Sequence, residues 1–336
     1  MRELESILER FQQARILIVG DLILDQYIWG EVNRISPEAP IPVVEVTRES
    51  YSLGGAANVA NNVRALGARA EVCGVVGDDG NGRMMMASLG ERGIGTRAVI
   101  TDPSRRTTLK TRVVAHKQQV VRVDREDARP VEIRLVEQMQ ARIQDLVPAL
   151  DAVIIEDYGK GVIQPDLLQT IVPLAREAGM VVTVDPKKDH FAHYRGVSAI
   201  TPNRAEAQDA SGIRITDTAS LYAAGRKLLD KVACRSVLIK LGDRGVCLFE
   251  SDKPPLELPA RAQEVYDVSG AGDTVIAVFT TALVAGATPG QAAALSNVAG
   301  GLVVEKLGTA TVSREELRRR LREEAQRDPD HTLVPR

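Results

Sequence analysis

Short apolar runs and longer amphipathic segments alternate along most of this chain. The apolar runs, of which "RILIVG" is typical, are rich in β-branched residues, a pattern of strands that are covered on both faces of a sheet. Such strands are predicted at 15–20, 70–77, 151–157, 180–186, 197–203 and 235–242. The segments between them have helical spacing, several with glycine near the end, and predict helices at 55–67, 131–146, 166–179 and 218–229. We therefore expect an α/β fold with a doubly wound, mainly parallel sheet and helices on both faces.

Two segments interrupt this alternation. Residues 27–50 and 105–127 are strand-like, carry prolines or charges, and have no helical pattern within them. They indicate an antiparallel β lid inserted into the α/β body, which would close over a substrate and pair with a second copy of the chain. Two plain surface hairpins are the alternative. Residues 1–326 are expected to form one domain, followed by a tail at 327–336. The last letters, "LVPR", resemble the remnant of a cleaved purification tag, with a native ending as the alternative.

Composition and charge exclude several classes of binding partner, although they say little about any reaction that the chain catalyses. The 336 residues carry a net charge of −2 and only 3% aromatic side chains, which speaks against a nucleic-acid surface. No apolar run is long enough to span a membrane, and the charged amphipathic start does not resemble a signal peptide. Cys73, Cys234 and Cys247 have neither CxxC nor zinc spacing, and none of the 4 histidines lies in a paired motif. We expect a cytoplasmic protein that binds neither nucleic acid nor membrane.

Carboxylates and glycines follow the first predicted strand. Asp21 and Asp25 lie beyond its carboxyl end, where open α/β sheets bind ligands, and two carboxylates there could accept hydrogen bonds from sugar hydroxyls. A helix cap or a salt bridge is the alternative. In "LGGAANVANN", Gly54 and Gly55 would let backbone approach a ligand closely, and Asn58 would present an amide. A plain loop that leads into a helix explains the same letters.

Two later turns also follow strands. In "TPNRAEA", Asn203 and Glu206 share one face of a helix start, which is typical of a cap with a first-turn acid or of a site for hydrated Mg²⁺. In "KLGDRG", Lys240, Gly242 and Gly245 form either an ordinary hairpin or a glycine turn beneath a nucleotide.

The stretch "DVSGAGDTV" carries the most specific chemical signal. Gly270, Ala271 and Gly272 would expose successive N–H groups at a helix N-terminus, which favours a phosphate. Asp273 would then lie beside the bound anion. A carboxylate there lowers the affinity for phosphate, so its presence indicates another role. A general base that takes the proton of an attacking hydroxyl is one such role. The alternative is an acid at a helix start behind glycines that only form the turn.

These segments together resemble the ribokinase-like (PfkB) family of carbohydrate kinases. No P-loop and no dinucleotide fingerprint is present, whereas "GGAANVANNVRALGARAEVCGVVGDDGNG" resembles the first signature of the family and "DVSGAGDTVIAVFTTAL" its second. The second is often written DTxGAGD, so that Val268 stands where threonine is commoner and Ser269 at the variable position. The resemblance runs from about residue 10 to 325.

Family membership would give these residues roles with ATP and Mg²⁺. Asp273 would be the catalytic base and Gly270 to Gly272 the anion hole, while Asn203 and Glu206 would order Mg²⁺ through water. Further residues would border the nucleotide, namely Lys240, Gly242, Gly245, Asn297 and Gly308. Sugar hydroxyls would be held by Asp21, Asp25, Gly54, Gly55 and Asn58. The lid would form a homodimer contact, and dependence on a monovalent cation stays open.

Within the family, the chain resembles the kinases of D-glycero-β-D-manno-heptose 7-phosphate. The segments that carry this similarity are "GDLILDQYIWGEVNRISPEAPIPVVEV", "TTLKTRVVAHKQQVVRVDRED", "EDYGKGV" and "TPNRAEA". The resemblance implies phosphorylation of the anomeric hydroxyl to the 1,7-bisphosphate, for ADP-heptose and lipopolysaccharide core synthesis. In many bacteria such a kinase is fused to a nucleotidyltransferase, which we expect on a separate protein here.

A substrate with a distal phosphate needs cations away from Asp273. We expect Lys110 or Arg106, together with Lys187, to bind that phosphate, with a solvated basic face as the alternative. Two other functions remain open, namely another sugar or sugar-phosphate kinase and a non-catalytic sugar-phosphate-binding regulator. An acid beside a phosphate site argues against the regulator.

Overall fold

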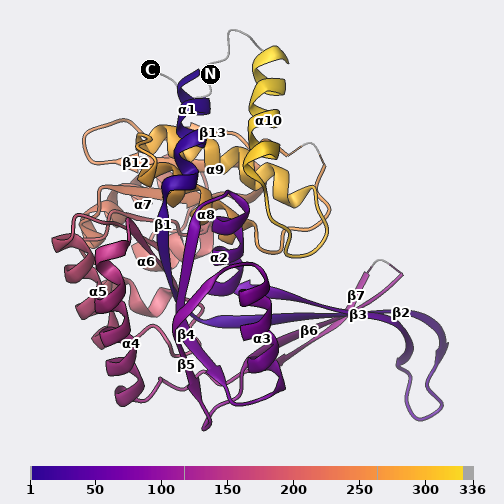
Figure 1. The fold of residues 1–336 in the computed structure, drawn as a ribbon. Helices are drawn as coiled ribbons and strands as arrows, with labels where there is room; N and C mark the ends of the chain where they lie inside the picture. The colour runs from indigo at the N-terminus through magenta and orange to yellow at the C-terminus, as the bar shows by residue number, and fades with distance from the viewer. Residues whose placement is uncertain (1, 117, 263, 328–336) are drawn as a thin grey trace.

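A computed structural model of the chain describes residues 2–116, 118–262 and 264–327. Its centre is a nine-stranded sheet in the order β13-β12-β11-β10-β9-β8-β1-β4-β5 (Figure 1). The seven strands β5, β4, β1, β8, β9, β10 and β11 pair in parallel, whereas β12 pairs antiparallel with β11 and with β13 at one edge. The strands are β1 (Arg15–Gly20), β4 (Arg69–Gly77), β5 (Gly95–Asp102), β8 (Ala152–Glu156), β9 (Val181–Asp185), β10 (Ala199–Ile200), β11 (Ser236–Lys240), β12 (Val246–Glu250) and β13 (Leu256–Leu258).

Helices cover both faces of this sheet because its central strands are apolar on both sides. On β1, Leu17 and Val19 join one buried cluster, whereas Ile16 and Ile18 join another. The first cluster includes α4 (Ile133–Leu146), α5 (Pro165–Glu177), α6 (Arg204–Ser211) and α7 (Thr218–Val232). The opposite face packs on α2 (Ala56–Ala65), α3 (Gly80–Glu91), α8 (Ala271–Val284) and α9 (Pro289–Val304). The doubly wound α/β fold is thus confirmed, although the predicted strand at 197–203 shortens to the two residues of β10.

Four further strands form a second sheet that projects from the body (Figure 1). They are β2 (Leu22–Ile35), β3 (Pro42–Gly55), β6 (Thr108–Ala115) and β7 (Gln118–Arg125), in the order β3-β2-β6-β7. The prediction of an antiparallel lid is correct for the hairpins β2–β3 and β6–β7 but wrong for the central pair, because β2 and β6 run parallel. We call these four strands the lid.

Lid strand β2 follows β1 after a single residue, Asp21, so that the lid grows directly from the carboxyl end of the central sheet. Within the lid, Asp25 pairs with Lys110 and Tyr27 with Arg112, which places these four side chains on one face. We call it the inner face, because Ser52 on the same face bonds Thr309 of the body, with 2.7 Å between the two hydroxyl oxygens. The site residues of the lid therefore turn towards the strand ends of the body.

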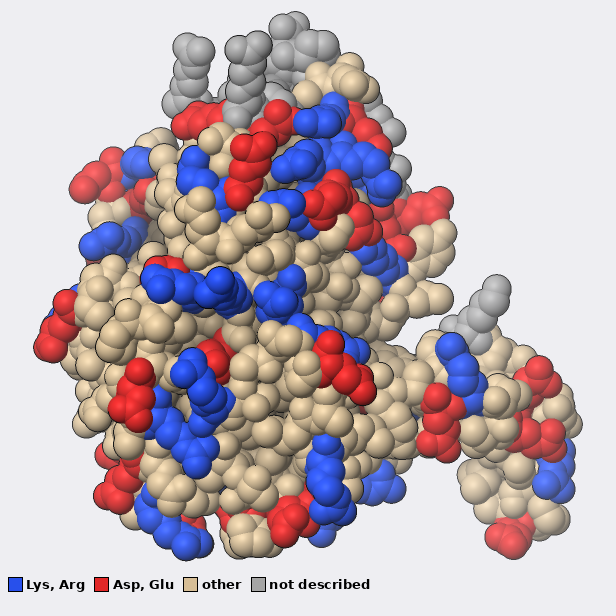
Figure 2. Space-filling view, in the orientation of Figure 1, with Lys and Arg blue, Asp and Glu red and all other residues tan. Residues whose placement is uncertain are grey.

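The remaining helices lie at the end of the body away from the lid. Helix α1 (Arg2–Arg10) packs beside α10 (Arg314–Arg327), where Arg322 donates to Glu5 across 2.6 Å (Figure 1). Basic and acidic side chains alternate over the face in Figure 2, without a broad area of one sign. None of the described helices is long and apolar enough to cross a bilayer. The single domain over 1–326 stays a prediction, and the tail at 327–336 lies outside the described residues beyond Arg327.

Candidate active site

Helix α8 begins at Ala271, directly behind the glycine that the sequence singled out. Gly270 caps the helix in the left-handed region with φ 77°, a backbone conformation that favours glycine. A Cβ on Gly270 would lie 2.8 Å from Nδ2 of Asn58, and one on Gly272 would lie 3.0 Å from Nζ of Lys240. Gly270 and Gly272 therefore carry no side chain because their neighbours approach the backbone, and the N–H groups at this helix start are able to receive an anion.

Asp273 lies in this first turn with 3% of its surface exposed. Asn58 donates to its Oδ2 across 2.6 Å, and the Tyr158 hydroxyl donates to its Oδ1 across 2.9 Å. Burial raises the pKa of Asp273 to about 6, although both donors oppose the rise by favouring the charged form. The carboxylate is consequently ionised near neutral pH and able to take a proton from a hydroxyl.

Two more carboxylates converge on Asp273 from the ends of neighbouring strands. Glu156 ends β8 and Asp185 ends β9, and carboxylate oxygens of all three acids lie within 4.8 Å of one another. Lys240 donates to both oxygens of Asp185 across 2.7 Å. Oε2 of Glu156 is buried without a hydrogen-bond partner among the described residues, and burial, followed by Asp185, raises the pKa of Glu156 well above its usual range. The site thus holds more negative than positive charge.

Asn203 and Glu206 form a reciprocal cap at the start of α6. The Asn203 side chain accepts from the Glu206 amide across 3.0 Å, and Oε2 of Glu206 accepts from the Asn203 amide across 2.8 Å. The capping alternative is therefore present, but Oε1 of Glu206 receives no hydrogen bond from the described residues. Burial and then Asp185 raise the pKa of Glu206. A carboxylate oxygen free to bind, set in excess negative charge, fits the oxygen ligands that Mg²⁺ takes through water.

A cavity of about 260 Å³ lies between α8, α9 and the turn that follows β11. The predicted nucleotide residues Lys240, Gly242, Gly245 and Asn297 all line it. Asn297 donates its amide to the Pro259 carbonyl across 2.7 Å, which fixes that wall. Apart from the charged Asp243 and Arg261, the rest of the lining is small or apolar, including Gly272, Gly300 and Gly301. Gly308 does not line this cavity: its amide donates across 3.0 Å to Asp267, near the start of α8.

The inner face of the lid brings Asp25, Lys110 and Arg112 to the site. Arg112 forms a buried ion pair with Oδ1 of Asp25. Asp25 also explains Gly54, because a Cβ on Gly54 would lie 2.3 Å from the other oxygen of Asp25. The Lys110 ammonium lies 5.4 Å from the ring centre of Tyr158, whose hydroxyl bonds Asp273. Lid and base are thus connected through one tyrosine.

Three residues predicted to hold sugar hydroxyls have other contacts in the structure. Asp21 is 1% exposed, and its two oxygens accept the amides of Tyr158, Lys160 and Val162, so that prediction is wrong because the loop after β8 occupies the carboxylate. Asn58 is fully buried and gives its amide to Asp273. Gly55 has φ 56° and a Cβ there would lie 2.5 Å from the Asp21 carbonyl, so backbone geometry explains this glycine.

The structure separates the basic residues expected to bind a distal phosphate. Lys110 lies beside Lys160, and burial together with that second ammonium lowers the pKa of Lys110. Lys160 also pairs with Glu126 across 2.6 Å. Lys187 lies against the same loop, with its side chain 3.6 Å from where a Cβ on Gly159 would be. Arg106 is exposed, and none of the described contacts brings it to this group.

Sequence reasoning missed Tyr158, Glu156 and Asp185. The two acids each end a predicted strand, so the rule that drew attention to Asp21 could have found them. Tyr158 lies within "EDYGKGV", a segment that carries the family resemblance, but no chemical motif gives a tyrosine two residues beyond a strand a role of its own.

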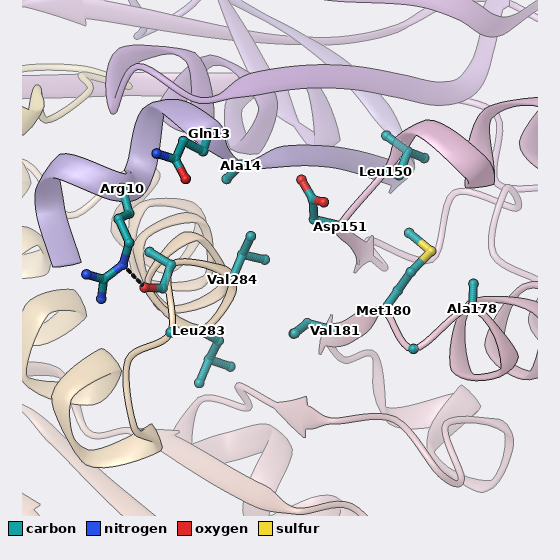
Figure 3. Close-up of a pocket in the computed structure, with 13 residues that line it drawn as sticks. Arg10, Gln13, Ala14, Leu150, Asp151, Ala178, Met180, Val181, Leu283 and Val284 are labelled. Atoms are coloured by element: carbon teal, nitrogen blue, oxygen red, sulfur yellow. Dashed lines mark hydrogen bonds between the residues drawn. The ribbon is translucent and has the colours of Figure 1, made fainter.

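A larger cavity of about 510 Å³ lies at the opposite ends of the strands (Figure 3). It is lined by residues that precede β1, β8 and β9 and by the end of α8, where Arg10 donates to the Ala285 carbonyl across 2.6 Å. None of the candidate site residues lies there. The chemistry of the molecule is therefore concentrated at the carboxyl ends of the strands.

Comparisons with known proteins agree with this geometry. The model of the pfkB family carbohydrate kinases matches residues 13–316. The chain is 45% identical over 314 residues to the bifunctional protein HldE of Desulfatibacillum aliphaticivorans, which covers 94% of this chain and 64% of the relative. It is 44% identical over 320 residues to the HldE of Pelobacter propionicus, with 94% and 65% covered. The chain therefore spans just under two thirds of the length of these curated relatives.

Solved structures show the same fold. Ribokinase of Arabidopsis thaliana, complexed with ribose and ATP, superposes with a TM-score of 0.72 at 20% identity and covers 92% of this chain and 98% of its own. Phosphofructokinase-2 of Escherichia coli, in complex with substrates and products, gives 0.77 at 16% identity, with 92% and 99% covered.

Proposed function

Because the chain belongs to the pfkB family of carbohydrate kinases, we propose that it transfers the γ-phosphoryl group of ATP to the anomeric hydroxyl of D-glycero-β-D-manno-heptose 7-phosphate. The product is the 1,7-bisphosphate, for ADP-heptose and lipopolysaccharide core synthesis. The observation that carries the kinase chemistry is the buried Asp273 behind the bare first turn of α8. The heptose substrate is supported by the sequence resemblance and by the identity to HldE proteins.

The geometry supports a direct transfer with Asp273 as the base. The ionised carboxylate takes the proton of the sugar hydroxyl while the hydroxyl oxygen attacks the γ-phosphorus and the bond to the ADP oxygen breaks. The amides of Gly270 to Gly272 stabilise the charge that develops on the phosphoryl oxygens. ATP would occupy the cavity between α8 and α9, with its phosphates directed to this turn. Mg²⁺, held by Asn203 and Glu206 through water, would neutralise phosphate charge.

The lid supplies the sugar side of the site in this proposal. Asp25 accepts hydrogen bonds from sugar hydroxyls, with Arg112 holding its other oxygen. The distal phosphate binds Lys110 together with Lys187, beside Lys160. Lys110 is favoured over Arg106 because it lies on the inner face next to Tyr158.

We also propose that the lid joins two copies of the chain. Its outer face, opposite the site, exposes apolar side chains, among them Tyr51, Val121 and Val123, which are 40%, 47% and 41% exposed. Apolar area of this kind is typical of surfaces that bind another protein. The remaining partner predictions, a separate nucleotidyltransferase and a monovalent cation, stay predictions, as does the cytoplasmic location.

The function is tested by ADP release from Mg-ATP against a panel of sugars. The panel contains the heptose 7-phosphate, ribose, fructose 1-phosphate and fructose 6-phosphate. We expect turnover with the heptose 7-phosphate and a loss of about 10²- to 10⁴-fold in Asp273→Asn with nucleotide binding retained. Turnover with only another sugar would disprove the assignment of the heptose 7-phosphate as substrate. Full activity of Asp273→Asn would disprove the role of Asp273 as the base.

The same assay tests the distal phosphate. Lys110→Ala should raise the KM for the sugar phosphate about tenfold or more, because a charge-assisted contact is removed. Arg106→Ala serves as the matched control on the neighbouring lid segment. If neither variant changed this KM, the assignment of the phosphate to the lid would be wrong.

A further inference from the structure

The loop that follows β8, residues 157–162, is held in one conformation from both of its sides. Asp21 accepts the amides of Tyr158, Lys160 and Val162 at 3.0, 2.9 and 3.1 Å. Asp157 accepts the Gly159 amide across 2.9 Å and the Tyr194 hydroxyl across 2.6 Å. A loop with this many bonds to buried carboxylates places its side chains rigidly.

Tyr158 is the side chain that this loop directs at the base. Its hydroxyl donates to Oδ1 of Asp273, while Asn58 donates to Oδ2. A carboxylate bonded at both oxygens by groups from two different elements cannot rotate about its terminal bond without breaking one of these bonds. The orientation of Asp273 is consequently set by Tyr158 and Asn58 before any substrate binds.

We propose that Tyr158 is the positioning residue of the catalytic base, and that its hydroxyl both orients the Asp273 carboxylate and stabilises its charged form. The proposal rests on the proposed role of Asp273 in phosphoryl transfer. Burial, followed by the charge of Asp273, raises the pKa of Tyr158 well above its usual range, so that the phenol keeps its proton and stays a donor. Tyr158 itself takes no proton from the substrate.

Other charged groups also face Asp273, and their effect on its ionisation must be separated from the effect of the Tyr158 hydroxyl. Asp185 of β9 opposes its ionisation and Lys240 of β11 favours it, while Glu156 of β8, whose own pKa is raised, lies within 4.8 Å of both acids. These charges are unchanged when a single hydroxyl is removed. Tyr158→Phe therefore isolates the contribution of one hydrogen bond to the base.

The test is the pH profile of kcat/KM in Tyr158→Phe, with the sugar that the wild-type protein phosphorylates. Loss of a donor to the charged form should move the acidic limb upward by about one pH unit, since a hydrogen bond to a charged group is of that size. Above the limb only the lost orientation of the carboxylate should lower the rate, and below the limb the variant should be about tenfold slower in addition to that loss. The KM for ATP should not change, because Tyr158 does not line the nucleotide cavity.

Tyr194→Phe is the matched control, because it removes a buried hydroxyl that bonds the same loop but not Asp273. Its acidic limb should stay at the wild-type pH even where its rate is lower. Asn58→Ala removes the other donor to Asp273 and should move the acidic limb in the same direction. This variant tests the same hydrogen-bonding effect if Tyr158→Phe does not fold.

A uniform loss of rate at every pH in Tyr158→Phe, or an unmoved limb, would overturn the proposal. Failure of the proposed function would instead be seen in the wild-type protein, as absence of turnover with the heptose 7-phosphate. The two failures are therefore distinguishable.

Discussion

Buried carboxyl groups dominate the site at the scale of single residues. Glu156 is 1% exposed, and its unpartnered oxygen lies among the carboxylates of Asp185 and Asp273. Its pKa is raised in the folded chain relative to the unfolded one, so folding favours the protonated form. Glu156 therefore contributes its full stability below the unfolded pKa, and this stability is lost as the pH rises through the folded pKa.

We predict that Glu156→Gln is more stable than the wild type at pH 8, by about 1–3 kcal/mol, because the amide needs no ionisation and its N–H groups can donate to the neighbouring carboxylates. The difference should vanish near pH 4. Urea unfolding at pH 4, 6 and 8 measures it. Glu177→Gln, an exposed change on α5, should show no such pH dependence. A Glu156→Gln variant that is less stable than the wild type at pH 8 would contradict the predicted direction of the stability change.

At this scale the sequence predicted the turn that carries Asp273, but not the distant residues that hold Asp273 in place. The glycines of "SGAGD" require a helix start, and α8 begins there, because backbone conformation is a local property. The role expected for Asp21 was wrong because its partners are amides 137 to 141 residues away. Tyr158 was missed for the same reason, since its contact with Asp273 spans 115 residues.

At the scale of elements, two packed helices leave room for a nucleotide. α8 and α9 approach closely through small residues, and a Cβ on Gly300 would meet only Cγ2 of Val275, at 3.1 Å. Gly300 also lines the nucleotide cavity. The cavity is therefore this wide because residue 300 is a glycine and has no side chain.

We predict that Gly300→Leu weakens ATP binding roughly 10- to 100-fold, because the new side chain fills the cavity. Calorimetric titration with a non-hydrolysable ATP analogue measures it. Gly90→Leu in α3, where a Cβ would have no neighbour within 4 Å, is the control for the helix propensity that both changes gain. Unchanged affinity in Gly300→Leu would place the nucleotide elsewhere.

Elements with strong local patterns were predictable, and their long-range pairing was not. The apolar runs of β1, β8 and β11 specify buried strands within a few residues of sequence. Both lid hairpins are local as well. The pairing of β2 with β6 depends on which edges meet after the body folds, and no local pattern distinguishes a parallel from an antiparallel partner there.

At the scale of the whole molecule, the lid has two faces with different tasks. The inner face carries Asp25, Lys110 and Arg112, and the outer face carries the exposed Val121 and Val123. Period-two alternation separates the two sets on the same strands. One thin sheet would thus serve the substrate on one side and a second copy of the chain on the other.

We predict that Val121→Asp converts a dimer to a monomer, because it would bury an unpaired charge in the interface. Sedimentation velocity measures the change. Ile133→Asp, at an even more exposed apolar position on α4 of the body, should leave the assembly intact. A Val121→Asp protein that remains dimeric would exclude this face of the lid.

The parallel pairing of β2 and β6 has a consequence for how the chain folds. Each hairpin closes locally, but the ladder between them joins Ile23 to Thr108, across about 85 residues. Closing so long a segment is entropically unfavourable until α2, β4, α3 and β5 have folded and shortened the path between the two hairpins. We therefore expect the lid to be completed only after these four elements have folded, so that the chain becomes able to hold a sugar only once this part of the body is in place.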